Sequence, residues 1–253
     1  MKRRISKTLL ALFVLAYIVM WAGGVGSHIL QGGTPEHMWW AAPVFLLLAS
    51  LIVLVTSEAT EIKALTLAAI IGIGSEIIGV RAGFLYGEYV YTDALRPVAL
   101  GVPLVMASAW MVLVAYIRQM MLFFRLPVWG EVAAASLWMT AIDLVIDPLA
   151  AGPLGYWRWL EAGEYYGIPA RNFLGWLIVS VLIFSLTGTL FKNRRAANLW
   201  ASLAGLSIIL FFTAMALIHG LRPVGYIGIM LCLLHAGIAF LPERIKALKA
   251  PSH

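Results

Sequence analysis

The stretch Asp143-Leu-Val-Ile-Asp147-Pro148 places two carboxylates inside a run that otherwise has the composition of a membrane-spanning helix. Four residues make slightly more than one helical turn, so Asp143 and Asp147 share a face and lie about 6 Å apart along the axis. Ser136 and Thr140 continue the same polar stripe. Pro148 disfavours helical geometry at the residue before it and predicts that the helix ends there. Acids inside a membrane helix are costly, which points to a function for this pair.

The composition around this stretch excludes a soluble globular domain. Of the 253 residues, 62% are hydrophobic and 12% are charged, and an aqueous fold of this size cannot hide so much apolar surface. Windows of about 20 apolar residues, the length that crosses a bilayer, can be placed eight times. The predicted spans are 8–28, 39–56, 62–80, 99–121, 129–148, 172–191, 197–218 and 223–241. We therefore predict an all-α, polytopic integral membrane helical bundle of about eight transmembrane helices, a single domain over residues 1–253, in the cell membrane.

The basic residues predict the orientation of this bundle, because short loops rich in Lys and Arg stay in the cytoplasm. One side receives thirteen of them: Lys2, Arg3, Arg4, Lys7, Lys63, Arg118, Arg125, Lys192, Arg194, Arg195, Arg244, Lys246 and Lys249. The other side receives Arg81, Arg96, Arg158, Arg171 and Arg222. This excess predicts a cytoplasmic N-terminus and C-terminus, with Arg118 and Arg125 as topological anchors. The net charge of +6 is then explained by orientation and contact with anionic lipid, not by nucleic acid.

The first span has a basic start like that of a signal peptide, but no Ala-x-Ala cleavage site follows it. We therefore expect a retained first helix. A single cysteine, Cys232, predicts neither an intramolecular disulfide nor a thiolate metal cluster.

A third acid, Glu76, lies about one turn below the outer end of the third span. Gly72, Gly79 and Gly83 share its helical face, and a glycine face lets neighbouring helices approach closely. Glu76 is therefore expected to point into the bundle, with Arg81 as its nearest counter-ion. Because the third and fifth spans run in the same direction, Glu76 and the aspartates should converge at one level near the outer surface.

Two outer connections share a sequence pattern. Gly-Glu-Tyr occurs at 87–89 and at 163–165, and each copy is followed by a Gly-(Val/Ile)-Pro segment that enters the next helix. The pattern predicts two related helical hairpins, the third with the fourth span and the fifth with the sixth, whose outer loops have the same task. The first loop could lie as a flap over the outer mouth of the bundle.

These residues favour acid chemistry. The sequence has no histidine cluster of the iron hydroxylase type, no phosphate-binding glycine loop and no Gly-x-Ser-x-Gly elbow. A carboxyl group buried among apolar groups can stay protonated near neutral pH, and a second carboxylate can stabilise a cation or take a proton from water. Tyrosine and tryptophan faces add cation-π stabilisation. The sequence thus contains no motif that predicts a metal or a redox cofactor.

At these residues the sequence resembles the integral-membrane carotenoid 1,2-hydratases, the family of the bacterioruberin-pathway and γ-carotene hydratases. The resemblance covers residues 72–180 and rests on a set of spaced motifs. They are Glu76 with the glycines and tyrosines of 79–89, Gly101-Val-Pro103, Asp143-x-x-x-Asp147-Pro148, Trp157-x-Trp159, Gly163-x-Tyr-Tyr-Gly-x-Pro169, Asn172-Phe173 and Gly175-Trp176.

The resemblance implies addition of water across the terminal C1–C2 double bond of an acyclic carotenoid, giving a tertiary alcohol. Asp143 or Glu76 would be the acid and Asp147 would position water, so these three residues are the predicted catalytic group. Asn172 with Tyr89, Tyr165 or Tyr166 would line the site. The implied substrate-binding set also includes Trp157, Trp159, Glu88, Glu164 and Arg171. The implied partners are a lipophilic carotenoid, the bilayer, water as co-substrate and other membrane enzymes of the carotenoid pathway.

Other functions stay open at this stage. In an intramembrane prenyltransferase the aspartates would hold Mg²⁺ on a diphosphate, with Arg158 and Arg171 as the available cations. A carotenoid cyclase begins with the same proton transfer but leaves the mass of its substrate unchanged. A proton-coupled transporter also uses intramembrane acids, yet it requires a path to both faces, and the sequence shows no inner polar stripe. In the remaining alternative the acids only hold helices together.

Overall fold

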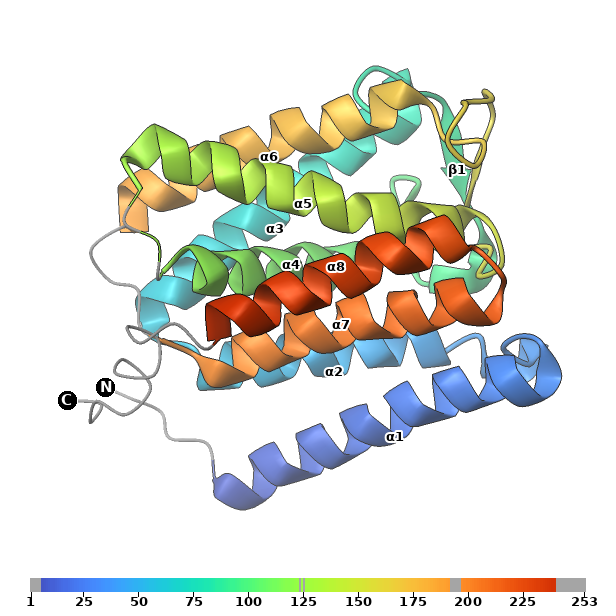
Figure 1. Cartoon of the computed structure of the whole chain (residues 1–253), viewed down its shortest axis with the longest axis horizontal. Helices are drawn as coiled ribbons and strands as arrows, with labels where there is room; N and C mark the ends of the chain where they lie inside the picture. The colour runs from blue at the N-terminus through green and yellow to red at the C-terminus, as the bar shows by residue number, and fades with distance from the viewer. Residues whose placement is uncertain (1–5, 123, 125, 192–196, 240–253) are drawn as a thin grey trace.

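The computed structural model describes residues 6–122, 124, 126–191 and 197–239. Within these ranges the fold is all-helical, as predicted, and the helices lie roughly along one long axis (Figure 1). The eight α-helices are α1 (Lys7–Gln31), α2 (Ala41–Thr56), α3 (Ala59–Ala82), α4 (Met106–Met121), α5 (Val128–Ala151), α6 (Ala170–Phe191), α7 (Leu199–Ile218) and α8 (Arg222–Ala239).

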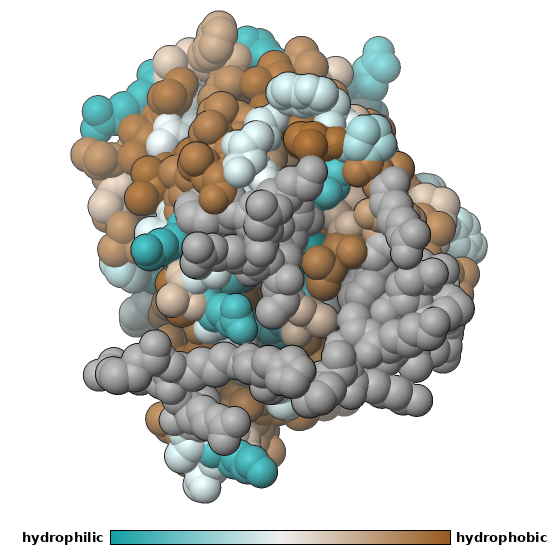
Figure 2. Space-filling model, turned by 90° about the vertical axis from the view of Figure 1, so that its left-hand side faces the viewer, coloured by the Kyte–Doolittle hydropathy of each residue, from teal (hydrophilic) through white to brown (hydrophobic). Residues whose placement is uncertain are grey.

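Seven helices of the described chain are long and apolar enough to cross a membrane, all but α4. Large apolar side chains such as Leu137, Ile178 and Leu233 are mostly exposed on them, as expected where lipid is the solvent. Seen from the end that carries both termini, apolar residues extend over the flanks (Figure 2). The chain is a multi-pass membrane protein. Its orientation stays a prediction, because ten of the thirteen basic residues counted on the inner side lie outside the described ranges.

The fourth predicted span is wrong at its start, since α4 begins at Met106 and has 16 residues. Before it, strands β2 (Val98–Ala99) and β3 (Val102–Pro103) pair as an antiparallel hairpin. Leu100 and Gly101 form its turn with φ values of 56° and 88°, and consecutive positive φ values fit a tight hairpin and not a helix.

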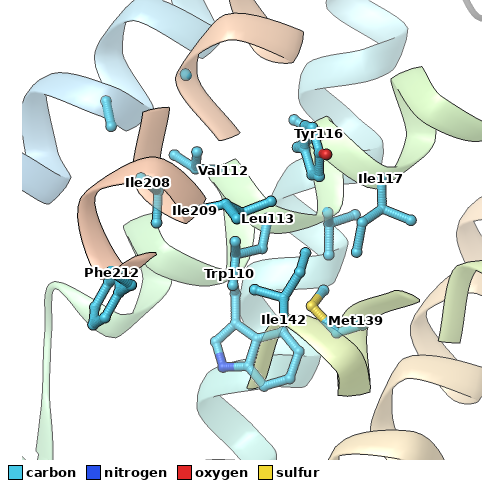
Figure 3. Packing of buried hydrophobic residues seen from close by; sticks show 14 of the residues in the cluster. Trp110, Val112, Leu113, Tyr116, Ile117, Met139, Ile142, Ile208, Ile209 and Phe212 are labelled. Atoms are coloured by element: carbon cyan, nitrogen blue, oxygen red, sulfur yellow. The ribbon is translucent and has the colours of Figure 1, made fainter. Parts of the chain in front are cut away.

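Helix α4 is the centre of the bundle, with 13 of its 16 residues buried. Around it pack Met139 and Ile142 of α5 and Ile208, Ile209 and Phe212 of α7 (Figure 3). The absence of a side chain at Gly72 of α3 makes room for Trp110, because a Cβ there would lie 2.4 Å from the indole ring. A helix enclosed by protein does not need the length of a lipid-facing span.

Arg118, predicted to be a topological anchor, lies in the last turn of α4 and is buried in the bundle. It is 2% exposed, and its Nε and Nη2 donate to the two carboxylate oxygens of Glu61 at 2.7 and 2.8 Å. Its Nη1 donates to the Thr187 carbonyl of α6 at 3.2 Å. The prediction failed because a charge count cannot show that α3 supplies a partner. Arg125, the other predicted anchor, lies outside the described residues.

Helix α5 does not end at Pro148 but continues to Ala151. A proline in a helix removes the hydrogen bond to the carbonyl four residues earlier, which here belongs to Leu144. The Tyr165 hydroxyl donates to that oxygen at 2.9 Å. The Tyr165 hydroxyl thus replaces the missing backbone hydrogen bond, so α5 continues past Pro148 and Asp147 lies inside the helix.

The two long connections form a cap over one end of the bundle, and we use cap for residues 83–105 and 152–169. Strand β1 (Tyr89–Tyr91) comes from the first connection and pairs antiparallel with β4 (Trp157–Trp159) from the second. Figure 1 places β1 at the end away from the termini. The two connections that share Gly-Glu-Tyr therefore lie together, in agreement with the shared task that the sequence predicted for them.

Candidate active site

Glu76 of α3 and both aspartates of α5 are buried beneath the cap. Their exposures are 4% for Glu76, 2% for Asp143 and 1% for Asp147. Glu76 and Asp147 line one common cavity, so the two helices bring their acids together. Three carboxyl groups in so small a volume need donors around them, because charged groups out of contact with water are costly.

Asn172 connects the two aspartates. It lies in the first turn of α6, and its Nδ2 donates to Asp143 Oδ2 at 2.8 Å and to Asp147 Oδ2 at 2.7 Å. The amide group has two hydrogens, and both are used here. Asn172 is 2% exposed, so it fixes the distance between the carboxyl groups within a dry environment.

The β1–β4 pair supplies the other donors. Alternate residues of a strand point to one side, and the register places Tyr89 opposite Trp159 and Tyr91 opposite Trp157. Both tyrosine hydroxyls donate to Glu76 Oε2, Tyr89 at 2.5 Å and Tyr91 at 2.9 Å. Trp157 Nε1 donates to Asp147 Oδ1 at 2.6 Å. One face of this short sheet is therefore the hydrogen-bonding surface of the carboxyl cluster.

The two tyrosines act as donors over the whole physiological range. Burial, together with the neighbouring Glu76 carboxylate, raises the pKa of Tyr89 and that of Tyr91. A phenol with a raised pKa keeps its proton. Both hydroxyl groups therefore offer Glu76 a hydrogen, and neither adds a negative charge to the cluster.

The three carboxyl groups differ in how they are bonded. Asp147 accepts an N–H bond on each oxygen, and Glu76 accepts two O–H bonds on Oε2. Asp143 accepts one bond on Oδ2, while its buried Oδ1 has no partner among the described residues. The indole Nε1 atoms of Trp110 and Trp159 are buried without a partner in the same ranges.

The cavity at the cluster has a volume of about 20 Å³, which is enough for one water molecule. Its wall consists of acids, one amide, one methionine and six aromatic residues: Glu76, Tyr86, Tyr89, Tyr91, Met106, Asp147, Trp157, Trp159, Asn172 and Trp176. A branched hydrocarbon end group is larger than this space. The cap or the side chains of the wall therefore have to move before such a group enters.

The structure brings together Glu76, Asp143, Asp147, Asn172, Tyr89, Trp157 and Trp159 from the predicted set. It places the other predicted members elsewhere. Tyr165 bonds the Leu144 carbonyl, and Tyr166 is 43% exposed.

The charged members of the predicted set lie on the outside of the cap. Glu88 and Glu164 are exposed. Arg171 is exposed and pairs with Glu161 at 3.0 Å. Arg81 is exposed as well, and among the described residues no ion pair joins it to Glu76. The tyrosines of the cap take the place of the expected counter-ion.

Sequence reasoning did not assign Tyr91, Tyr86, Met106, Trp110 or Trp176 to the site. The sequence did contain a signal for Tyr91: it lies two residues after Tyr89, so in a strand the two side chains point to the same side. Trp110 and Trp176 stack with ring centroids 4.5 Å apart. Trp176 had a signal in the Gly175-Trp176 motif of the family resemblance. Trp110 comes from a helix whose sequence is apolar around it, so no local pattern separates it from an ordinary core residue.

The geometry offers little to a metal ion. Among the described residues, no group of three or more His, Cys, Asp or Glu side chains is arranged to hold one. The Asp147 oxygens face N–H donors. Arg171 is paired on the surface, and Arg158 lies on the strand face opposite to Trp157 and Trp159. The cations that a prenyltransferase would need therefore lie outside the cluster.

A bundle of membrane helices with a carboxyl cluster buried under an aromatic cap places the chain among the multi-pass membrane proteins that hold a polar site inside the bundle. Comparison with known proteins gives the family. The chain belongs to the carotenoid biosynthesis protein family, whose model matches residues 39–235. The family expected from the sequence is thereby confirmed.

Individual relatives match over shorter stretches. The chain is 37% identical over 119 residues to a bisanhydrobacterioruberin hydratase of Haloarcula japonica, which covers 44% of this chain and 40% of the relative. It is 29% identical over 101 residues to a UPF0060 membrane protein of Pseudomonas fluorescens, covering 38% of this chain and 86% of the relative. The chain thus spans less than half the length of the hydratase. No solved structure matches.

Proposed function

We propose that this protein is a carotenoid hydratase that adds water across the terminal C1–C2 double bond of an acyclic carotenoid end group. The observation that carries the proposal is the pair Asp143 and Asp147, joined by Asn172 and buried beneath aromatic rings. Membership of the family and the similarity to a bisanhydrobacterioruberin hydratase support a substrate of this class.

The hydrogen bonds support a division of labour within the pair. Two carboxyl groups that share one amide group this closely cannot both ionise at low cost. Asp147 accepts two N–H donors, which favour its charged form, whereas Asp143 accepts one and keeps a free oxygen. In the proposed mechanism Asp143 therefore carries the proton and Asp147 the charge.

Hydration then proceeds in two steps. The Asp143 proton is transferred to the less substituted carbon, C2, which leaves a tertiary cation at C1 and an Asp143 carboxylate. A water molecule held by Asp147 adds its oxygen to C1 and gives one proton to Asp147. Transfer of that proton to Asp143 restores the site, so one alkene and one water give one tertiary alcohol.

The wall of the cavity is suited to the cation. Six aromatic residues surround the space, and aromatic faces stabilise a positive centre by about 0.5–2 kcal/mol each. Glu76, held by Tyr89 and Tyr91, adds a further negative charge at the wall of the cavity. In this mechanism its task is electrostatic, whereas the sequence left the role of acid open between Glu76 and Asp143.

Expression in bacterial cells that accumulate an acyclic carotenoid tests the proposal. Mass analysis of the pigments is expected to show one added water for each hydrated end. Asp143→Asn, Asp147→Asn and Glu76→Gln are each expected to lower this product strongly, by about 100-fold or more for the aspartates.

Glu36→Gln is the matched control, because this exposed acid lies in the α1–α2 connection, outside the cap and the predicted site. It is expected to leave the product yield unchanged at equal membrane content of the protein. Wild-type yield from all three cluster variants would refute the mechanism. A product of unchanged mass would identify a cyclase instead.

A further inference from the structure

Two serines, Ser136 on α5 and Ser180 on α6, are fully buried without a hydrogen-bond partner among the described residues. Ser136 and Ser180 are both 0% exposed, and the Oγ atom of each has no hydrogen-bond partner among the described residues. Other hydroxyl groups of these helices bond back to their own backbone, as Thr140 does to the Ser136 carbonyl at 3.0 Å and Thr187 to Ile183 at 2.8 Å. A buried hydroxyl without a partner costs about 1–3 kcal/mol.

The register of the two helices places these serines at nearly the same level along the bundle. Helices α5 and α6 lie side by side, joined at the cap end, so they run in opposite directions (Figure 1). Asn172 bonds residues 143 and 147, which puts it level with residue 145. Ser180, eight residues further on, is then level with residue 137. Phe184 and Gly188 of α6 share a cavity with Val132 and Val128 of α5, as the same register requires.

Polar groups lie at both ends of this interface. The unpartnered Asp143 Oδ1 is on the Ser136 face of α5, seven residues and about 10 Å towards the cap. In the other direction the ion pair of Arg118 and Glu61 closes the interface.

A cavity of about 10 Å³ lies beside this ion pair, near the volume that one water molecule needs. It is lined by Arg118, Met121, Val128, Glu131, Val132, Ala135, Phe184 and Gly188. The sequence alone did not predict a polar stripe on this side of the bundle.

We propose that the interface of Ser136 and Ser180 binds a short file of internal water molecules and that this file delivers the water consumed at Asp147. Buried polar groups without protein partners are the usual sites of ordered internal water. About three molecules in hydrogen-bond contact span the distance from Ser136 to Asp143. The delivery role rests on the proposed hydratase function, whereas the binding of water does not.

This route explains how a dry site obtains water. The β1–β4 pair covers the acids from the cap side with Tyr89, Tyr91, Trp157 and Trp159. A route between α5 and α6 brings water from the opposite end, so the aromatic wall need not open to bulk water while a cation is present. Water and carotenoid would then reach the cluster from different directions.

Radiolytic footprinting of the purified full-length protein tests the water file without reference to activity. Met139 lies between Ser136 and Asp143 on α5 and is 0% exposed, as is Met215 on α7. Radicals formed from bound water oxidise a neighbouring methionine, so Met139 is expected to be oxidised at least five times faster than Met215. In Ser136→Val/Ser180→Val, which fills the interface with methyl groups, this excess is expected to disappear.

Thr189→Val is the matched control, since this exposed hydroxyl of α6 bonds to its own helix. It should keep the Met139 excess, and thermal unfolding shows whether the double variant is folded. If the valine double variant does not fold, Ser136→Ala/Ser180→Ala replaces it, because alanine removes the hydroxyl groups without adding volume. The excess oxidation of Met139 is expected to disappear in this variant as well. Equal oxidation of Met139 and Met215 in the wild type would overturn the water file.

Turnover tests delivery separately. The valine double variant is expected to lose about tenfold in hydration rate at saturating carotenoid, with half-saturation unchanged. An unchanged rate together with a lost Met139 excess would overturn the delivery role. A wild-type protein without hydratase activity would overturn the proposed function. The oxidation of Met139 relative to Met215 would still show whether the interface binds water.

Discussion

At the scale of single residues, Asp143 and Asp147 are held by donors from other segments of the chain, Asn172 of α6 and Trp157 of β4. Asp143 and Asp147 were noticeable because an intramembrane acid is rare and costly. Asn172 and Trp157 entered the prediction through family resemblance, and Tyr91 did not enter it at all. Donors to a buried acid can come from any segment that reaches it, so spacing along the chain does not reveal them.

The Trp157 indole is predicted to set the charge of Asp147. Trp157→Phe keeps an aromatic face but removes the N–H that bonds Oδ1 at 2.6 Å. A hydrogen bond to a charged group is worth about 1.5–3 kcal/mol, so the hydration rate is expected to fall by about 10- to 100-fold. Initial rates at saturating carotenoid measure this effect.

Trp129→Phe serves as the control for the Trp157 variant, because Trp129 is 72% exposed at the start of α5. It should leave the rate unchanged. Equal rates for the Trp157 variant and the wild type would show that the Asp147 charge does not depend on the indole.

At the scale of elements, hydropathy located the helices, but it did not locate the start of α4 or the end of α5, which depend on backbone hydrogen bonds. The segment 98–103 is as apolar as a helix start, yet Leu100 and Gly101 turn the chain into a hairpin. Pro148 would end an isolated helix. In the folded protein Tyr165 compensates for it from a loop 17 residues away, a tertiary contact that local rules cannot contain.

Tyr165 is predicted to stabilise α5 and not to take part in the chemistry. Burial raises the pKa of Tyr165 to about 12, so its hydroxyl keeps the proton that it donates to the Leu144 carbonyl. Tyr165→Phe leaves this carbonyl without that donor and is expected to cost about 1–3 kcal/mol of stability. Thermal unfolding in detergent measures the loss.

A double-mutant cycle separates this bond from general packing. Pro148→Ala restores a backbone N–H that can bond the Leu144 carbonyl. In that background Tyr165→Phe should cost much less than in the wild type, and Tyr166→Phe should cost little in either. An equal cost of Tyr165→Phe in both backgrounds would contradict the compensation.

At the scale of the whole molecule, the bundle and its membrane location followed from composition, whereas the arrangement of the helices did not. All eight predicted spans correspond to helices, but a short central α4 enclosed by the others was not foreseen. Arg118 was predicted to be a topological anchor because it lies at a helix end on the side rich in basic residues. The burial of Arg118 depends on Glu61 of α3 and Thr187 of α6 converging on it.

The pair of Arg118 and Glu61 is predicted to hold α3 and α4 together at the end away from the cap. Removing one partner of a buried ion pair costs about 3–5 kcal/mol, whereas replacing both with apolar residues is often neutral. Arg118→Met should therefore lower the unfolding temperature markedly, and Arg118→Met/Glu61→Leu should recover most of the loss. Lys63→Met, at an exposed position of α3, is the control. Equal stability of the single and double variants would contradict the role of the pair.

The central claim is that the carboxyl cluster adds water to a carotenoid, and isotope labelling tests it most directly. Purified protein is incubated with an acyclic carotenoid in water enriched in ¹⁸O, and the product is analysed by mass spectrometry. We predict a product heavier by one labelled water for each hydrated end, formed by the wild type and lost in Asp143→Asn. A product whose hydroxyl oxygen is unlabelled, or a labelled product formed equally by the Asp143→Asn variant, would contradict the claim.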